Sequence, residues 1–194
     1  MRSSSRVAVC AALAVSAVGG QQAQAFTVNK TPLTSNEKNI ENLGTGVAIA
    51  LPLVAGGIAY YKKDKVGVAQ LLVETALTVG TAFALKNIVR ERRPDGSDYK
   101  SFPSETTALA ASGSSFLWRR YGWEYGLPTF AMTEFVSYSR IQARQHRWYD
   151  ALASSGIAAG YSYALGTPFK KRYNVETSLE PAPDGAMVRL SYQW

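Results

Sequence analysis

Apolar segments of helical length follow one another through the middle of the chain. Gly, Pro and charged residues separate these segments, so the pattern predicts helices joined by short connections. The first two are mainly aliphatic, and the later three are rich in Ala, Ser, Thr and aromatic residues. We expect five helices, at 43–61, 66–93, about 104–120, about 126–143 and about 147–166.

The same segments raise the question of a membrane. Segment 43–61 is nearly free of charge and long enough to cross a bilayer, whereas the next segment carries Gln70 and Glu74 within its apolar part. Small and hydroxyl-bearing residues suit close helix packing in either environment. The mean hydropathy of −0.10 is low for a polytopic membrane protein, so a soluble all-α bundle is the alternative. We favour a membrane-associated bundle.

Beyond Thr167 and Pro168 the period of the pattern changes. The stretches YNVETSLE and AMVRLSYQW alternate apolar and polar residues on either side of a Pro-Asp-Gly turn. Such alternation predicts a β-hairpin. The fold class is therefore all-α, a helical bundle over 26–168 with a short C-terminal hairpin appendage over 169–194.

The N-terminus resembles a targeting segment. Two arginines precede an apolar run, and small residues follow at Ala23 and Ala25. This pattern predicts a cleavable signal peptide over 1–25, with a mature chain that starts near Phe26, although a first transmembrane helix is the alternative. The only cysteine, Cys10, lies inside this segment. We expect secretion across an inner membrane and a mature protein without thiol chemistry.

The charge balance indicates an anionic partner. The chain has 21 Lys and Arg against 14 Asp and Glu, a net charge of +7. Charge alone does not separate lipid, nucleotide and nucleic acid. The basic residues crowd around the motifs described next and accompany no nucleic-acid-binding module, so we expect no nucleic-acid partner. No cluster of Cys and His suggests a metal, and we expect neither metal nor cofactor.

Two short stretches carry candidate phosphate ligands. In KNIVRERRP, Lys86 and Arg93 stand nearly two helical turns apart, so both cations would project from one face and grip phosphate oxygens. The alternative is a basic helix end that stabilises its own dipole or meets lipid headgroups. In FPSETT, Ser104 and the N–H groups of a helix start would form an anion site. An ordinary N-cap is the alternative there.

The third stretch, SRIQARQHRWYD, holds the only histidine. His146 and Asp150 are four residues apart, which would place them on one helix face, with the carboxylate holding one ring nitrogen and the other free as a nucleophile. Arg140 lies six residues upstream, within reach if the chain turns. A structural His–Asp pair is the alternative.

Together the three stretches resemble the signature of the type 2 phosphatidic acid phosphatase (PAP2) superfamily, which includes lipid phosphatases, acid phosphatases and vanadium haloperoxidases. The resemblance covers residues 86–150. It implies an all-α fold and a phosphohistidine mechanism. It also implies that His146 attacks phosphorus and Asp150 orients it, while four residues hold phosphate: Lys86, Arg93, Ser104 and Arg140. A vanadate-binding haloperoxidase is a more remote possibility for this chain, since little in its short, apolar sequence favours that activity.

One departure from that signature concerns the general acid. The usual Pro-Ser-Gly-His reads Pro103-Ser104-Glu105-Thr106 here, so the histidine that protonates the leaving oxygen is missing. General acid catalysis typically contributes roughly 100- to 10,000-fold. Glu105 and Thr106 are the available substitutes, but nearby cations favour ionised Glu105, and a threonine hydroxyl is a very poor acid.

Two functions follow from these motifs. The first is a membrane-associated phosphatase at the periplasmic face of the cell envelope, acting on a lipid phosphate or diphosphate of the undecaprenyl or lipid A type. A diphosphate suits the missing acid best, because phosphate leaves with less help than an alkoxide. The alternative is a catalytically impaired relative that binds a phosphate-bearing lipid or has a structural role. The sequence leaves the oligomeric state open.

Overall fold

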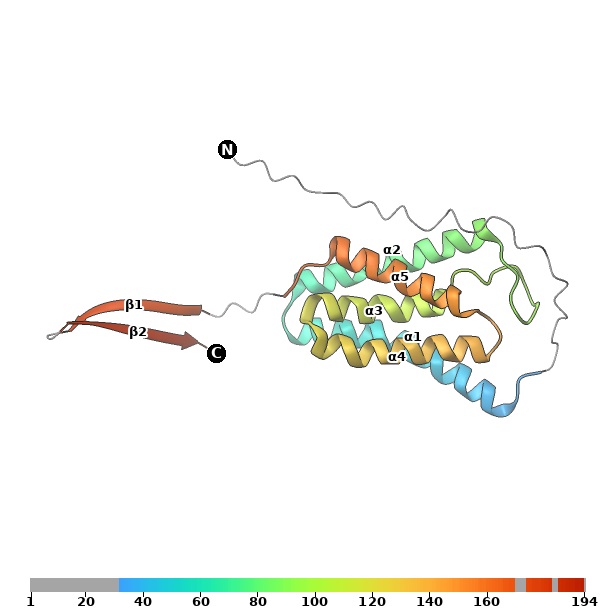
Figure 1. Ribbon diagram of the computed structural model, residues 1–194, viewed down its shortest axis with the longest axis horizontal. Helices are drawn as coiled ribbons and strands as arrows, with labels where there is room; N and C mark the ends of the chain where they lie inside the picture. Colours follow the sequence, from blue (N-terminus) through green and yellow to red (C-terminus); the bar gives the residue numbers. More distant parts are fainter. Residues whose placement is uncertain (1–31, 170–173, 183–184, 194) are drawn as a thin grey trace, which may run out of the picture.

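A computed structural model describes residues 32–169, 174–182 and 185–193. It contains five helices and one two-stranded sheet (Figure 1). The predicted signal peptide and Cys10 lie outside the described residues. The helices are α1 (Ser35–Tyr61), α2 (Lys65–Val89), α3 (Glu105–Tyr121), α4 (Trp123–Gln142) and α5 (Trp148–Leu165), and the strands are β1 (Asn174–Ala182) and β2 (Gly185–Gln193).

The predicted elements are all present, with some shifted ends. Helix α1 begins at Ser35 rather than at 43, because Thr34 and Glu37 form a capping box that starts the helix within a polar stretch. Helix α2 ends at Val89, since Arg90 adopts the left-handed conformation (φ 47°) and breaks the helix before the last arginines. The hairpin pairs antiparallel from Asn174↔Gln193 to Ala182↔Gly185.

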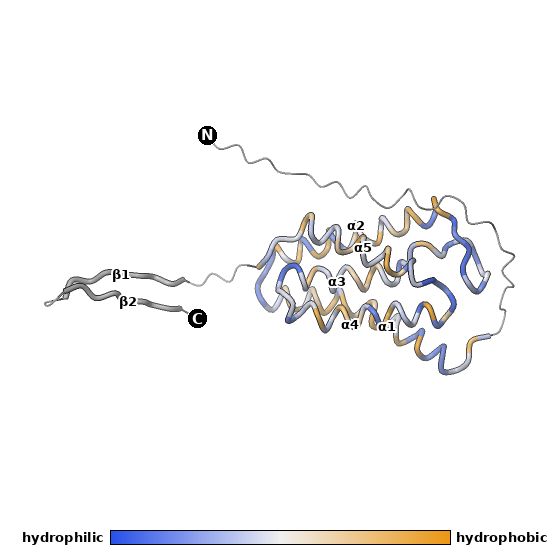
Figure 2. The backbone as a smooth tube through the Cα atoms, in the orientation of Figure 1, coloured by the Kyte–Doolittle hydropathy of each residue, from blue (hydrophilic) through white to orange (hydrophobic). Residues whose placement is uncertain are grey.

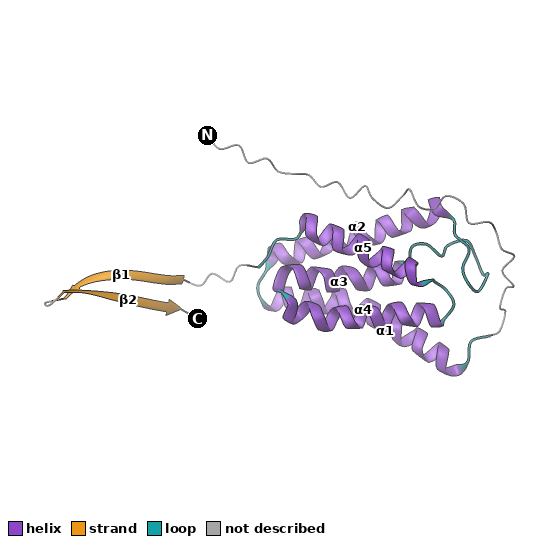
Figure 3. Cartoon of the chain, in the orientation of Figure 1, coloured by secondary structure: helices purple, strands orange, loops and turns teal. Residues whose placement is uncertain are grey.

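The five helices run up and down side by side, while the hairpin lies apart from them (Figures 1 and 3). One end of the bundle gathers the long α2–α3 loop, the α4–α5 loop and the start of α1; we name it the His146 end. The other end carries the short turn between α1 and α2, and we name it the Asp64 end.

Helix α3 is the centre of the bundle, because it packs against all four other helices. Its buried residues are small or hydroxyl-bearing over most of its length, and only near its C-terminal end do Phe116 and Leu117 fill a larger apolar core. There is little room for a side chain where α3 crosses α1. A methyl group on Gly113 would lie 2.8 Å from the backbone of Leu51 and of Pro52.

The outer surface of the bundle is apolar. Helices α1 and α2 are long and apolar enough to cross a membrane. Their large side chains face outward: Leu53 is 70% exposed and Leu72 is 66% exposed. Along the backbone, hydrophilic colours are concentrated in the loops at the two ends of the bundle (Figure 2). Exposed aliphatic residues around a core of Ala, Ser and Thr are the reverse of a soluble bundle.

A buried ion pair ties the Asp64 end together. Asp64 caps α2 by accepting the N–H of Gly67, and it also accepts hydrogen bonds from Arg120 (2.6 and 2.7 Å) and from the hydroxyl of Tyr121 (2.8 Å). Burial alone would raise the pKa of Asp64, but these donors hold it below its usual range. The α1–α2 turn is thereby fixed to the end of α3.

Candidate functional site

All the residues singled out in the three motifs lie at the His146 end. Lys86 comes from the end of α2, Arg93 from the α2–α3 loop, Arg140 from the last turn of α4 and His146 from the α4–α5 loop. The four side chains on which the proposed chemistry depends are almost completely buried, with exposures of 5% or less: Lys86, Arg140, His146 and Asp150. Segments far apart in the sequence thus meet in one closed polar centre.

His146 is held in a defined tautomer. Its Nδ1 lies 2.6 Å from the backbone carbonyl oxygen of Ser101, an atom that can only accept a hydrogen bond. The proton of a neutral ring must therefore be on Nδ1. The Nε2 atom keeps its lone pair, as nucleophilic attack requires.

Asp150 supports the histidine, but not as a partner on one helix. The expectation that the two share a helix face is wrong, because α5 begins at Trp148 and His146 precedes it. The carboxylate Oδ2 of Asp150 is 3.6 Å from Nδ1, beyond the length of a hydrogen bond. Instead it accepts the hydroxyl of Ser101 (2.6 Å) and the backbone N–H of Arg147 (2.8 Å).

Ser101 is the residue that sequence reasoning missed. Its carbonyl accepts from His146 and its hydroxyl donates to Asp150, so one residue joins the histidine to the carboxylate. It is completely buried. A carbonyl acceptor leaves no mark in a sequence. The only available signal was that Ser101 lies two residues before Pro103, in the second motif.

Each predicted phosphate cation already has an acidic neighbour. The ammonium of Lys86 forms an ion pair with Glu105 (3.1 Å), and Arg93 forms one with Asp98 (2.8 Å). Burial alone would raise the pKa of Asp98, but hydrogen bonds from the N–H of Lys100 and from the Arg93 side chain hold it below its usual range. Asp98 therefore remains a carboxylate beside Arg93.

Arg140 is held more tightly than either of them. It donates to the backbone carbonyl of Glu41 and to the hydroxyl of Thr45 (2.9 Å), both on α1, and the Glu41 carboxylate is 3.9 Å away. Burial lowers the pKa of Arg140, the Glu41 carboxylate opposes this effect, and the positive charge of nearby Arg93 lowers the pKa further. The guanidinium groups of Arg93 and Arg140 are therefore near each other. An oxyanion bound between them would offset the repulsion of their positive charges.

Ser104 and the two acid substitutes lie at the start of α3. Ser104 is the N-cap, and its hydroxyl oxygen accepts the N–H of Thr107 (3.3 Å). Its backbone N–H is directed at the carbonyl of Asp150 (3.4 Å). The carboxylate of Glu105 forms an ion pair with Lys86, and Thr106 is half-buried. Neither substitute is placed as a ready proton donor.

Glu91 braces the two loops of this end against each other. It accepts a hydrogen bond from the guanidinium of Arg147 (2.7 Å) and another from the hydroxyl of Tyr149. The backbone N–H of Ser101 donates to the Glu91 carbonyl (2.9 Å). Both Ser101, whose carbonyl accepts from His146, and the start of α5 are thus fixed to the segment that follows α2.

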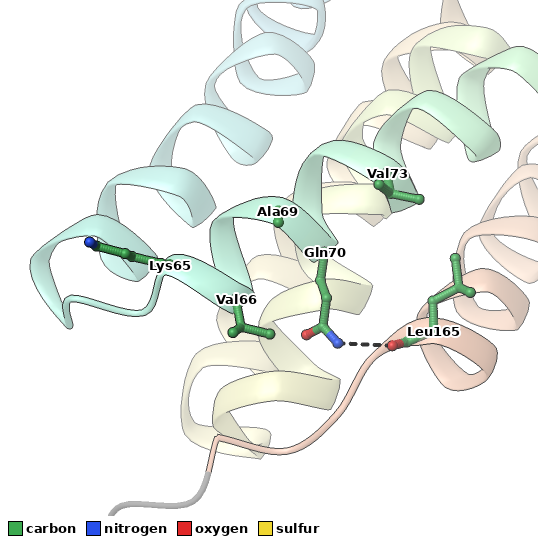
Figure 4. Close-up of a pocket in the computed structure, with 6 residues that line it drawn as sticks. All are labelled: Lys65, Val66, Ala69, Gln70, Val73 and Leu165. Atoms are coloured by element: carbon green, nitrogen blue, oxygen red, sulfur yellow. Dashed lines mark hydrogen bonds between the residues drawn. The ribbon is translucent and has the colours of Figure 1, made fainter.

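One hollow of the described surface lies away from this centre. It is an open depression of about 470 Å³ between α2 and the end of α5, at the Asp64 end, where Gln70 donates to the carbonyl of Leu165 at 3.0 Å (Figure 4). Its walls are almost wholly apolar, and no His, Ser or Cys side chain lines it. We therefore base the chemistry on the residues around His146.

A buried nucleophilic nitrogen beside several cations can take up a phosphoryl group, because the cations stabilise the charge on its oxygens. In the described part of the chain, no group of three or more His, Cys, Asp and Glu side chains could hold a metal ion. The expectation of no metal cofactor remains a prediction.

The chain is similar to proteins that are already known. No family model matches the chain. The lipid A 4'-phosphatase of Helicobacter pylori (strain J99 / ATCC 700824) is 27% identical over 184 residues, which cover 87% of this chain and 92% of that protein. The crystal structure of Aquifex aeolicus LpxE superposes with a TM-score of 0.49 at 19% identity, over 66% of this chain and 91% of the other.

Proposed function

We propose that this protein is a membrane-embedded phosphatase of the PAP2 type that hydrolyses a lipid phosphate in the cell envelope, through a phosphohistidine formed on His146. The observation that carries the proposal is the tautomer of this histidine, whose Nδ1–H is given to the Ser101 carbonyl. Its Nε2 lone pair is thereby free, in a centre with three cations from separate segments.

In the proposed reaction, Nε2 of His146 attacks phosphorus, and the bond from phosphorus to the lipid oxygen breaks. The electron pair of that bond leaves with the lipid oxygen, which takes its proton from water in the absence of the usual histidine. A second water then attacks phosphorus, the phosphorus–nitrogen bond breaks and its electron pair returns to Nε2. The proton lost by this water neutralises the hydroxide left by the first, and inorganic phosphate is released. Lys86, Arg93 and Arg140 stabilise the oxygens throughout.

The class of substrate is supported by the relative and by the surface. The name of the Helicobacter protein specifies a phosphate on lipid A, and the match extends over nearly all of that protein. The apolar exterior of α1 and α2 would place the centre beside lipid headgroups. We therefore propose a lipid A-type phosphate as substrate. A lipid diphosphate is the second choice, since its leaving group needs less protonation.

The second candidate function is phosphate-lipid binding without turnover. It is favoured by the ion pair between Glu105 and Lys86, which places a carboxylate where the signature has glycine. A negative charge there competes with a phosphate for the same ammonium. In this reading the retained His146 and Asp150 are parts of a disused catalytic centre.

Phosphate release by the full chain in detergent tests both functions. The substrates are a lipid A phosphate, an undecaprenyl diphosphate and a phosphatidic acid, and His146→Ala is compared with the parent. We expect release that His146→Ala abolishes and that the Thr106→His variant raises by about 100-fold, the lower range for a general acid.

A matched control removes an arginine outside the centre. Arg90→Gln should retain the parental rate, because Arg90 is an exposed residue at the end of α2. Equal release from the parent and from His146→Ala would exclude the phosphohistidine. Saturable binding of lipid phosphate without release, in the parent and in Thr106→His alike, would favour the binding protein.

A further inference from the structure

A groove runs between α4 and α5, over the exposed side of α3. Each of these two helices packs closely on α3, but they contact each other much less. The space between them is a cavity of about 270 Å³. Small residues and aromatic residues line it. The small ones include Ala111, Ser114, Ser155 and Ala159, and the aromatic ones include Trp118 and Phe130.

Polar groups gather at one end of this groove. Arg119, Ser162 and Tyr163 line its portion nearest the Asp64 end. Ser162 is only 2% exposed, and within the described residues its hydroxyl has no hydrogen-bond partner; the same holds for Nε of Arg119. The Arg119 guanidinium lies over the ring of Tyr163 at 5.1 Å. Two buried donors thus lack an acceptor at the same place.

Glu74 is the carboxylate nearest to this end. It is 1% exposed on α2 and lies beside Ser162, and both Arg120 and Arg119 are near enough to favour its charged form, although neither of its oxygens makes a hydrogen bond in the described structure. It forms no ion pair with Arg119. The guanidinium of Arg119 is therefore available to an anion such as a phosphate. A charged Glu74 would reduce the gain.

The groove is polar at the Asp64 end and apolar toward the middle of the bundle, and this order indicates which ligand fits. A substrate tail extending from His146 into the groove would bring its terminal methyl group to Arg119, and hydrocarbon against a partly buried charge is unfavourable. A lipid entering from the Asp64 end has the opposite polarity. Its phosphate would meet Arg119 and Ser162, and one acyl chain would lie along the small residues toward the middle of the bundle.

The Asp64 end also has the features of a membrane surface. Exposed aromatic side chains surround it, with Tyr60 82%, Tyr61 87% and Trp123 66% exposed, as at a lipid–water interface. Lysines at 62, 63 and 65 add positive charge in the turn between α1 and α2. Such a rim attracts anionic rather than zwitterionic headgroups.

We propose that the groove between α4 and α5 binds an anionic phospholipid from the leaflet opposite the His146 centre, with its phosphate on Arg119 and Ser162. This site is separate from the proposed phosphatase centre. It depends on membrane insertion but not on catalysis, so it can be tested by binding alone.

The experiment is native mass spectrometry of the full chain, extracted from vesicles of equal parts phosphatidylglycerol and phosphatidylcholine. The parent should retain phosphatidylglycerol preferentially. Arg119→Gln should lower that preference about tenfold, as expected for loss of one charge-assisted hydrogen-bond partner. Ala159→Trp, which fills the groove, should remove both lipids. Arg90→Gln, which removes an exposed arginine at the other end, should leave retention unchanged.

Three results would overturn the site. These are equal retention in all variants, an equal loss in Arg119→Gln and Arg90→Gln, or a dimer that Ala159→Trp disrupts while lipid retention is unaffected. In the last case the groove would be an interface between copies of the chain, for which the exposed Gly156 and Gly160 of α5 are suited. Failure of the chain to insert into vesicles would instead count against the membrane assignment.

Discussion

At the scale of single residues, the main feature of the centre is that its cations are already neutralised by carboxylates. Lys86 faces Glu105, Arg93 faces Asp98, and Arg140 has Glu41 nearby. A phosphate that binds here must displace or outweigh these acids. Resting neutrality keeps three buried or half-buried cations together without a ligand, at the cost of weaker affinity for phosphate.

Glu105 is the acid whose removal gives the clearest test of this competition. We expect Glu105→Gln to tighten the binding of inorganic phosphate by about two- to fivefold, the value of a partly exposed ion pair. Isothermal titration of the detergent-solubilised chain measures it. Glu124→Gln, which removes an exposed carboxylate at the Asp64 end, is the control. Weaker phosphate binding in Glu105→Gln would mean that this carboxylate helps the site rather than competing with it.

Ser101 gives the second prediction at this scale. Ser101→Ala keeps the carbonyl that accepts from His146 but removes the hydroxyl that donates to Asp150 at 2.6 Å. Loss of a hydrogen bond to a buried charge should lower kcat by about 10- to 100-fold with little change in KM.

The conservative variant and a neighbouring serine complete this test of Ser101. Ser101→Thr should recover part of the lost kcat, because it restores a hydroxyl. Ser97→Ala should retain the parental kcat, since Ser97 is exposed and uses only its backbone N–H to bond Asp95. A fall in kcat that Ser101→Thr does not reverse would indicate a packing defect instead of a positioning role.

At the scale of elements, the sequence predicted five helices and a hairpin correctly, because Gly, Pro and charged residues separate the apolar segments clearly. It did not predict how His146 and Asp150 meet. Their spacing suggested one helix, but Arg147 is the N-cap of α5, so the histidine lies in the preceding loop. The four-residue spacing in the sequence predicts that His146 and Asp150 are close. Which atoms they contact depends on the conformation of the loop, which the spacing does not determine.

The packing of α3 on α1 gives a prediction about stability. A methyl group at Gly113 would lie 2.8 Å from the backbone of Leu51 and of Pro52, which cannot move aside as a side chain could. Gly113→Ala should therefore destabilise the bundle by about 1–3 kcal/mol, as overpacking does. Thermal unfolding in detergent measures the change.

A second glycine serves as the control for this prediction. A methyl group at Gly46, within α1, would meet nothing within 4 Å. Gly46→Ala should leave Tm unchanged or raise it, because alanine favours helix more than glycine does. If both variants unfold at the parental temperature, α3 does not approach α1 as closely as described.

At the scale of the whole molecule, polar residues lie inside the bundle and apolar residues lie on its outer surface. Hydroxyl groups and charges lie between the helices and at the two ends, and large aliphatic side chains cover the outside. Mean hydropathy could not reveal this, because it averages a polar interior with an apolar exterior. The low value of −0.10 is therefore compatible with a bundle in lipid.

The last prediction separates this arrangement from a soluble bundle. Leu72 lies in the first half of α2 and is 66% exposed. In water, Leu72→Arg would be a harmless surface change, whereas in lipid a charge within a spanning helix costs up to about 2.5–3.5 kcal/mol, the value at the helix centre. We expect the variant to lose membrane insertion, measured as the fraction that resists alkaline extraction. Tyr60→Arg should insert normally, since at the end of α1 an arginine reaches the headgroups. Normal insertion of both variants, or full extraction of the parent, would place α2 outside the bilayer.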